Sequence, residues 1–482
     1  MHKKGHILMV GRIFETQELE RLYDSDESEF VAVYGRRRVG KTYLVREVFE
    51  GRFTFQHTGL PRGRTHAQLT HFYKSLTLAG LASRPMPKNW MSAFEMLKSL
   101  IADSRQSRKT VFIDEMPWMD TPKSDFLMAL EAFWNEWASA RTDVLLIVCG
   151  SAAAWMVKNL FRNRGGLHNR ITARLHLEPF TLCECEKFIQ ERGLEMTRRD
   201  ITECYMVLGG IPFYWRQLVR GLSVAQNIDR LFFSKNASLR SEFEELYSSL
   251  FKDADIYKKI VRALSTKKIG MTRLEISDAA ELKSTGKLTD ALETLESSGF
   301  IRRYRSLGNK KRNSIYQLID NFTLFHFKFL DDPSSDETYW TSISSSPAKS
   351  SWRGLAFERV CLQHHNQIRK SLGFAAVHTE VYGWSHRGDD VYPTGAQIDL
   401  IFERDDNVIN VCEIKYSDEP FAIDKRCDRD LASKLAAFKG VTKTTKAVHL
   451  TMITSAGLVR NAYWNRVQSE LSLDELFTPA SH

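Results

Sequence analysis

Residues 35–42 read GRRRVGKT, a spacing that suits the binding of nucleotide phosphates. In the pattern G-x-x-x-x-G-K-[ST], backbone N–H groups cradle the phosphates, the lysine reaches the β- and γ-phosphates, and the hydroxyl ligates Mg²⁺. The glycines permit the tight loop, and the N-terminus of the following helix adds the positive end of its dipole. The sequence therefore predicts a site for ATP and Mg²⁺ made of Gly35, Arg36, Arg37, Arg38, Val39, Gly40, Lys41 and Thr42.

Two adjacent carboxylates can supply the rest of this chemistry. Asp114 and Glu115 follow the apolar run Val111–Ile113. We expect Asp114 to hold Mg²⁺, directly or through water, and Glu115 to polarise the attacking water as a general base. One carboxylate alone would support only binding, so the pair favours hydrolysis.

A serine follows a third apolar run, Val144–Cys149, after Gly150. The carboxyl ends of parallel strands meet at one edge of a sheet, so Ser151 is expected in the same crevice, at the γ-phosphate or the attacking water. The alternative is that Ser151 caps the helix expected over residues 152–160, as serine often does. The two roles can coexist.

A second set of charged residues lies near the C-terminus. A polar turn separates the runs 397–402 and 408–412 and predicts a hairpin that brings Asp399 near Glu413. Lys415 then shares a strand face with Glu413.

Two carboxylates and an ammonium suit metal-assisted hydrolysis of a phosphodiester. Asp399 and Glu413 would hold the metal, and Lys415 would position or activate water. Glu358, on a helix expected from residue 354 to about 372, can add a ligand. The alternative is a buried network of salt bridges that has no catalytic role, because such a network would show the same residue pattern.

The middle of the chain is basic. Residues 251–330 contain 16 Lys and Arg against nine Asp and Glu, in a chain whose net charge is +9. Helices expected at 257–264, 271–279 and 282–298, followed by strands at 300–305 and 314–318, describe a winged helix, whose third helix enters the major groove. The residues expected to face duplex DNA are Ser284, Thr285 and Lys287 on that helix and Lys310, Lys311 and Arg312 on the wing. A module used only for packing is the alternative.

The elements that must position these residues indicate an α/β protein. In the first half, apolar runs at 30–34, 53–57, 111–113 and 144–148 alternate with helical segments such as 66–78 and 126–137. This alternation predicts an open parallel sheet with helices on both faces. Residues 178–245 read as helical, and the Ser-, Pro- and Asp-rich segment at 331–336 and 342–351 reads as a linker or an exposed loop.

These motifs together resemble the archaeal-type ATPases of the AAA+ superfamily. The matching residues are, in order, Gly11-Arg12, the phosphate loop, Asp114-Glu115, Gly150-Ser151 and the stretch Gly209–Tyr214. The resemblance implies a five-stranded parallel sheet with a helical lid, Arg12 near the adenine, and residues 209–214 over the nucleotide. The family's Gly-Arg corresponds to Asn169-Arg170. The resemblance therefore makes Arg170 the candidate arginine that senses the γ-phosphate, with Arg174 as the second candidate. The γ-phosphate is expected to be that of a nucleotide bound to a neighbouring subunit of a homo-oligomer.

The order Glu358, Asp399, then Glu413-x-Lys415 resembles the restriction-endonuclease-like fold, and specifically the C-terminal domain that accompanies these ATPases. The implied organisation is an ATPase core (1–177), a helical lid (178–248), a winged helix (249–330) and an endonuclease-like domain (345–482). Three functions remain open: an ATPase coupled to DNA binding and a nuclease-like domain, a nuclease whose access the ATPase gates, and a regulatory switch whose last domain only binds a partner.

The composition indicates the cellular compartment in which we expect the protein to lie. No stretch approaches the ~20 apolar residues that a membrane-spanning helix needs, and residues 7–10 are too short for a signal-peptide core. Seven cysteines scattered over 482 residues fit a reducing cytoplasm rather than a disulfide framework.

Overall fold

The computed structural model describes residues 10–162, 166–167, 169–305, 314–332, 334, 336–393 and 395–479. The chain forms two compact units, Met1–Pro179 and Phe180–His482. The predicted end of the ATPase core, at residue 177, lies two residues from this division. The segment expected as a lid, from residue 178, belongs almost entirely to the second unit.

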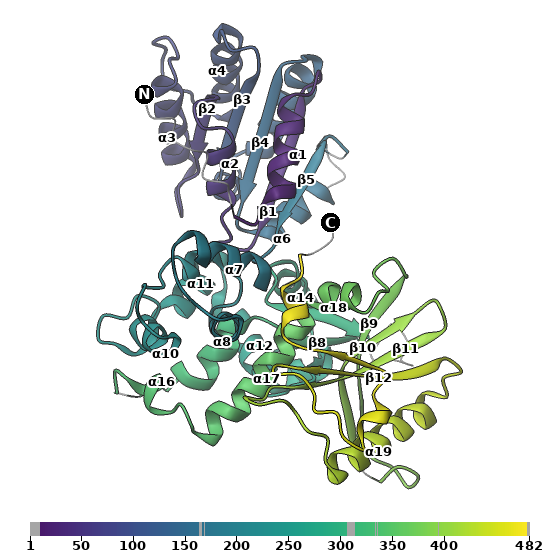
Figure 1. Cartoon of the computed structure of the whole chain (residues 1–482). Coiled ribbons are helices and arrows are strands. Elements are labelled where there is room, and N and C mark those ends of the chain that lie inside the picture. Colours follow the sequence, from purple (N-terminus) through teal and green to yellow (C-terminus); the bar gives the residue numbers. More distant parts are fainter. Residues whose placement is uncertain are drawn as a thin grey trace. The chain divides into compact units, whose positions relative to one another are not determined.

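The first unit is built on a five-stranded sheet (Figure 1). Its order is β2-β3-β4-β1-β5, and every pair is parallel. The strands are β1 (Glu29–Gly35), β2 (Phe53–Thr58), β3 (Lys109–Asp114), β4 (Val144–Gly150) and β5 (Ala173–Leu177). The predicted parallel α/β fold is therefore confirmed, with each of the four expected strands in place.

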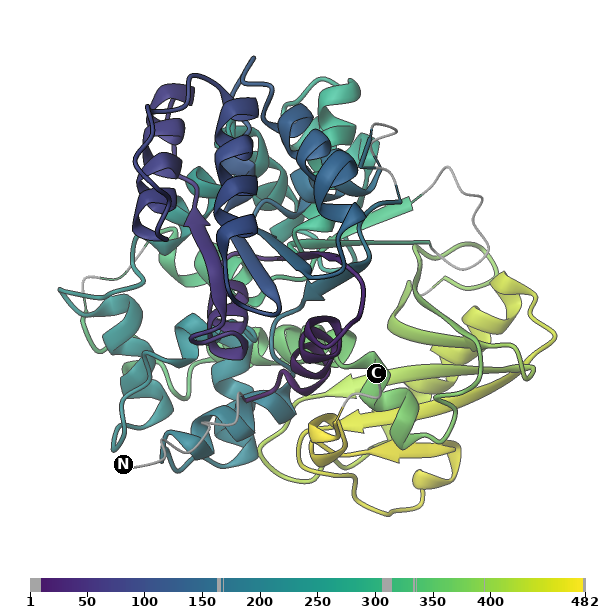
Figure 2. The same cartoon turned by 90° about the horizontal axis from the view of Figure 1, so that it is seen from above.

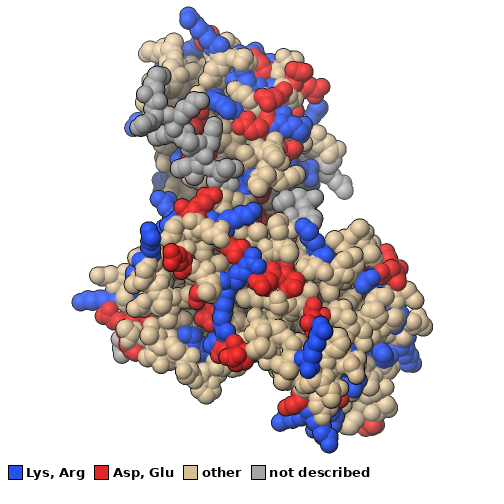
Figure 3. Space-filling model, viewed as in Figure 1, with Lys and Arg blue, Asp and Glu red and all other residues tan. Residues whose placement is uncertain are grey.

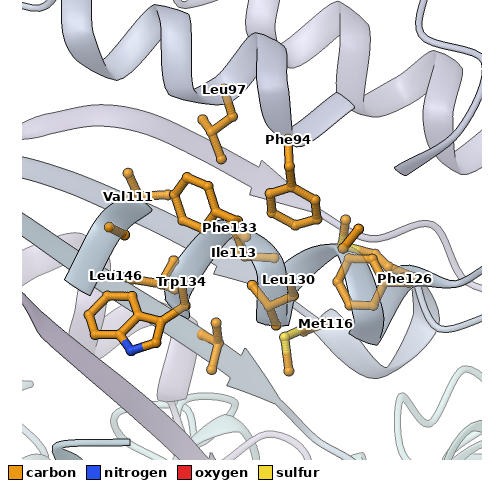
Figure 4. Close-up of a cluster of buried hydrophobic side chains, with 14 of the residues drawn as sticks. Phe94, Leu97, Val111, Ile113, Met116, Phe126, Leu130, Phe133, Trp134 and Leu146 are labelled. Atoms are coloured by element: carbon orange, nitrogen blue, oxygen red, sulfur yellow. The ribbon is translucent and has the colours of Figure 1, made fainter. Parts of the chain in front are cut away.

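Helices cover both faces of this sheet. Helix α1 (Ile13–Tyr23) precedes the first strand, and the α-helices between the strands are α2 (Lys41–Val48), α3 (Thr65–Leu78), α4 (Trp90–Asp103), α5 (Phe126–Ala132) and α6 (Ala153–Met156). Side chains of α3, α4 and α5 form one core cluster with alternate residues of the strands, including Val111, Ile113 and Leu146 (Figure 4). The intervening strand residues, such as Phe112 and Ile147, are buried as well. Burial on both faces explains why these strands read as continuous apolar runs.

A buried histidine couples the stability of the first unit to pH. The His57 ring lies on β2, with Nδ1 2.9 Å from Ser75 Oγ and its centroid 5.0 Å from that of the His71 ring. Burial, and then the neighbouring His71, lower the pKa of His57 from 6.5 to about 3. Folding therefore favours the neutral ring, and the stability this contributes is present above pH 6.5 and is lost as pH falls from 6.5 towards 3.

We expect the free energy of local opening around β2 and α3 to be about 2 kcal/mol smaller at pH 5 than at pH 7, since 1.5 pH units lie between the unfolded pKa and pH 5. Amide hydrogen exchange of residues 53–78 in the intact chain measures it. His57→Phe removes the titrating group and should abolish most of this difference, whereas an unchanged difference would assign it to other groups.

The second unit begins with helices and continues with a small mixed module. As predicted, residues 182–250 are helical, in α7 (Leu182–Glu191), α8 (Arg198–Leu208), α9 (Pro212–Trp215), α10 (Val224–Ile228) and α11 (Glu242–Leu250). The module contains α12 (Ala254–Ser265), α13 (Arg273–Ala279) and α14 (Gly286–Ser297), with the three-stranded sheet β6-β8-β7. Its strands are β6 (Met271–Thr272), β7 (Ile301–Arg305) and β8 (Ser314–Leu318). Thr272 caps α13, because its side chain accepts a hydrogen bond from Glu275 N.

The segment expected as a linker or exposed loop, 331–336 and 342–351, is mostly exposed in its described residues, but a helix begins inside it at Pro347. Between its two parts lies α16 (Tyr339–Ser342), and Trp340 is buried against Phe325, Phe329 and Trp352. The carboxylate of Asp229 accepts bonds from the backbone of Trp340 and Thr341. One aromatic residue and one buried acceptor thus fix a segment whose composition is otherwise that of a loop.

A second five-stranded sheet ends the chain, drawn in green to yellow in Figure 2. Its order is β13-β12-β11-β10-β9, antiparallel from β9 to β11 and parallel from β11 to β13. The elements are α17 (Pro347–Gln363), α18 (His365–Ser371), β9 (Thr379–His386), β10 (Ala396–Arg404), β11 (Val408–Lys415), α19 (Lys425–Thr442), β12 (Ala447–Thr454) and β13 (Ser469–Leu471). The helix expected from residue 354 begins seven residues earlier, where Ser346 caps it and Pro347 starts its first turn.

Among the residues described above, no helix has the length and apolar character needed to cross a membrane.

Candidate functional site

The phosphate loop connects β1 to α2. Gly35 has φ +146°, and a Cβ there would lie 2.3 Å from Leu177 O, so only glycine fits. Gly40 has φ +96° and is the N-cap of α2, which leaves the first N–H groups of that helix available to an anion. The loop therefore has the geometry that its sequence predicts.

Lys41 and Arg12 hold the loop from its two sides. Lys41 is buried, and its Nζ donates to Gly35 O at 3.0 Å and to Arg36 O at 2.8 Å. Burial lowers the pKa of Lys41. Arg12 donates to Val39 O and to Glu178 O, and its contact with adenine stays a prediction.

Asp114 lies at the carboxyl end of β3 and faces the loop. Its Oδ2 accepts a bond of 2.9 Å from Thr42 Oγ1, and its Oδ1 accepts one from Glu115 N. The strand order places β3, β4 and β1 side by side, so the ends of these three strands meet. Thr42 and Asp114 thus present oxygen donors to one point, which suits a hard cation such as Mg²⁺.

Glu115 and Ser151 form a pair at the same edge. Glu115 has φ +46°, and its Oε2 accepts bonds from Ser151 Oγ at 2.8 Å and from Ser151 N at 3.2 Å. The expectation that Ser151 caps the next helix is wrong, because α6 begins after Ala152 and receives no side-chain cap bond. The hydroxyl instead holds the carboxylate expected to act as general base.

The two candidate arginines lie around β5. Arg170 is exposed in the turn before this strand, next to Asn169, whose φ is +58°. Arg174 is on β5, and its guanidinium lies 4.6 Å from the centre of the Phe161 ring. Arg174 is thus engaged within its own unit, and the role of Arg170 stays a prediction.

The predicted hairpin near the C-terminus is confirmed. Strands β10 and β11 pair with Leu400 opposite Cys412, and this register places Asp399 opposite Glu413. The pairing of β10 with β9 shifts between Ile398 and Ile401, so Asp399 lies within a β-bulge or irregularity of this edge of β10. Bulges often re-aim a side chain near an active site.

The structure divides the expected three-carboxylate cluster into two ion-paired groups. Glu413 Oε1 lies 2.9 Å from Lys415 Nζ, and its Oε2 lies 2.5 Å from Lys434 Nζ. Glu358 and Asp399 share the ammonium of Lys268 instead. Within the described part of the chain, no group of three or more His, Cys, Asp and Glu side chains is arranged to hold a metal ion.

Both groups line one cavity of about 1030 Å³. Its wall includes Lys268, Glu358, Asp399, Glu413, Lys415 and Lys434, together with Arg426 and Arg429 of α19. Positions 426, 429, 430, 433, 434 and 437 share one face of α19, so this helix presents three cations to the cavity. Burial, and then the nearby Asp399 carboxylate, raise the pKa of Glu358 to about 7. The cavity combines carboxylates with several cations, which suits an anionic ligand bound beside a metal ion.

Lys268 is the residue that sequence reasoning missed. It lies 90 residues before Glu358 and 131 before Asp399, and no motif connects them. Lys434 is on α19, 21 residues after Glu413, and only the packing of that helix on the sheet explains their contact.

The residues expected to meet nucleic acid are partly described. Ser284, Thr285 and Lys287 are exposed at the start of α14, as expected. Lys310, Lys311 and Arg312 lie outside the described residues. On the face drawn in Figure 3, Lys and Arg are interspersed with Asp and Glu rather than gathered in one broad patch. The docking of this module on DNA therefore stays a prediction.

Residues 9–218 match the family model of an ATPase domain predominantly from Archaea. This part of the chain, which contains the phosphate loop, is therefore similar to that family of ATPase domains. An uncharacterised protein of Methanocaldococcus jannaschii is 25% identical over 433 residues, which are 89% of this chain and 92% of that protein. An uncharacterised ATP-binding protein of the same archaeon is 38% identical over 48 residues, covering 10% of this chain and 81% of that protein.

Two solved structures resemble this chain at low identity. A Walker-type ATPase of Pyrococcus abyssi is 16% identical, with a TM-score of 0.47, over 67% of this chain and 96% of that one. The ORC2 protein of Aeropyrum pernix, in complexes with ADPNP and ADP, is also 16% identical, with a TM-score of 0.41, over 70% of this chain and 96% of that one.

Proposed function

We propose that the first unit binds ATP with Mg²⁺ and hydrolyses it, and that the second unit binds duplex DNA and cleaves its backbone with a divalent metal. The observation that carries the first part is the hydrogen bond from Thr42 to Asp114 beside the phosphate loop. These two oxygens fit Mg²⁺, which would neutralise charge on the β- and γ-phosphates when bound.

The residues of the first unit then have separate roles. Lys41, now bonded to two loop carbonyls, exchanges them for phosphate oxygens. Glu115 accepts a proton from the attacking water, once its carboxylate is free of Ser151 or shares that contact with the water. Arg170 is exposed and can reach a nucleotide of another subunit, where it would stabilise charge on the γ-phosphate.

The observation that supports a nuclease is the register of the C-terminal hairpin. It puts Asp399 opposite Glu413, with Lys415 two residues on and the basic face of α19 beside the same cavity. A bound metal ion would stabilise charge on the phosphodiester. Mg²⁺ often binds to only one or two carboxylates and completes its shell with water and substrate phosphates, so Asp399 with Glu358 or Glu413 is a sufficient donor set. Lys415 and Lys434 are placed to hold the phosphate or orient water.

The experiment is cleavage of supercoiled plasmid by the wild-type chain with Mg²⁺ or Mn²⁺, with and without ATP. We expect nicked or linear product in at least one of these conditions. No product in any of them, together with no metal binding by calorimetry, would contradict the nuclease assignment.

A second candidate function is a regulatory switch whose C-terminal part only binds a partner. It is favoured by one observation: each of the three carboxylates has a lysine partner, from among Lys268, Lys415 and Lys434. Such a network is stable without a metal, and it predicts ATP-dependent binding of a partner with no cleavage.

Duplex DNA binding should depend on the start of α14. Lys283 and Lys287 are exposed there, and each phosphate contact contributes about 0.9 to the slope of log affinity against log salt. Lys283→Ala with Lys287→Ala should therefore lower the slope by about two. Fluorescence anisotropy between 50 and roughly 200 mM salt measures the slope. The control pair Arg220→Ala with Lys235→Ala removes two exposed charges from the helical segment, and an equal effect of both pairs would mean nonspecific attraction.

A further inference from the structure

The carboxylates of Glu358 and Asp399 already share a cation. Lys268 Nζ lies 2.7 Å from Glu358 Oε1 on α17 and 3.0 Å from Asp399 Oδ2 on β10. Both carboxylate side chains are largely buried, with 12% and 14% of their surface exposed. The ammonium is therefore at the point where the two carboxylates converge.

A divalent cation held by the same two carboxylates would need the same space. Mg²⁺ and related ions lie about 2.0–2.5 Å from their oxygen ligands, closer than an ammonium. The remaining oxygens differ in how they are engaged. Asp399 Oδ1 accepts a bond from Gln397 Nε2 at 2.6 Å, and Glu358 Oε2 is buried with no hydrogen-bond partner within the ranges described above. A metal ion and the ammonium thus exclude each other at this pair.

The backbone of Lys268 is fixed although its side chain can move. Lys268 O accepts a bond of 2.7 Å from Gln317 Nε2 on β8 and another from Arg359 on α17. The next carbonyl, of Ile269, accepts a bond from the Tyr304 hydroxyl on β7. The side chain lines the cavity with 32% of its surface exposed, and its four-carbon stem is flexible. Withdrawal of the ammonium therefore needs rotation of the stem and leaves these backbone bonds intact.

We propose that Lys268, which lies between α12 and β6, competes with the divalent metal ion for the carboxylates of Glu358 and Asp399. This inference rests on the proposed metal-dependent function of the same cavity. The ammonium satisfies the carboxylates when no metal is bound, and metal binding displaces it into the cavity. A phosphate of the substrate is the anion that would receive the displaced ammonium, so substrate and metal binding reinforce each other.

The test is Mn²⁺ affinity of the intact chain, measured by calorimetry without ATP or DNA. Lys268→Met keeps the length of the stem and removes the charge, so it should bind Mn²⁺ about 10- to 100-fold more tightly than the wild type. This factor corresponds to the free energy of the charge-assisted hydrogen bonds that the metal must break in the wild type. Lys268→Arg keeps a cation and should stay close to the wild type. Adding Asp399→Asn to Lys268→Met should remove the gain.

The outcomes separate two failures. Equal Mn²⁺ affinity of the wild type and Lys268→Met would overturn the competition and leave the metal site standing. No Mn²⁺ binding by either of them, with both folded by circular dichroism, would overturn the competition together with the metal-dependent function. If Lys268→Met does not fold, Lys268→Ala in the same titration decides by the same criteria.

Discussion

Replacing Glu115 by Gln is expected to leave ATP binding intact and to slow ATP hydrolysis on the order of 10²–10⁴-fold, the usual contribution of a positioned general base. The amide keeps the shape of the side chain and its bond to Ser151, but it cannot take a proton from water. Calorimetry with ATP and Mg²⁺ measures binding, and release of inorganic phosphate measures turnover.

Lys41→Ala provides the contrasting variant, because the buried amine that would meet the phosphates is gone. It should lose ATP binding itself. Glu95→Gln, which changes an exposed carboxylate on α4, controls for the loss of one charge in the same unit. If Glu115→Gln turned ATP over at the wild-type rate, the proton acceptor would have to be another group, and Asp114 would be the first to test.

The phosphate loop was predictable because its chemistry is local. A strand, a loop with glycines at fixed positions and a helix follow each other within 20 residues, so sequence spacing fixes their geometry. The pairing of Asp114 with Thr42 spans 72 residues, yet it was also predictable, since parallel strands end at one edge of their sheet. The order of the strands places β3 and β4 beside this site, and local sequence patterns do not predict that order.

The C-terminal site was predictable only in part. The hairpin register follows from a turn of known length, so the position of Asp399 opposite Glu413 could be inferred. The register shift between Ile398 and Ile401 could not be inferred, and neither could the contact of Lys268 with Asp399, because both depend on packing between elements far apart in the sequence. From the sequence we expected Asp399 and Glu413 to hold a metal ion, whose charge would offset the repulsion between these carboxylates. Lysines from distant elements do this in the structure, a solution that spacing cannot reveal.

Replacing Lys415 by Ala is expected to lower metal-dependent plasmid cleavage on the order of 10²–10³-fold, as the loss of one preorganised electrostatic group typically does. Lys415 lies 2.9 Å from Glu413 and lines the cavity, so its ammonium can meet a phosphate without moving far. Asp399→Asn should be at least as damaging, because it removes a charged ligand of the metal. Conversion of supercoiled to nicked plasmid over time gives the rates.

These two variants also distinguish catalysis from packing. Asp405→Asn removes an exposed carboxylate from the turn of the same hairpin and should cleave at the wild-type rate. Lys415→Ala should keep its Mn²⁺ affinity, whereas Asp399→Asn should lose it, since only the aspartate is assigned to the metal. A variant pair that lost cleavage and thermal stability equally would indicate a structural salt-bridge network. If neither substitution changed the rate, cleavage would have to arise outside this cavity, because both side chains line it.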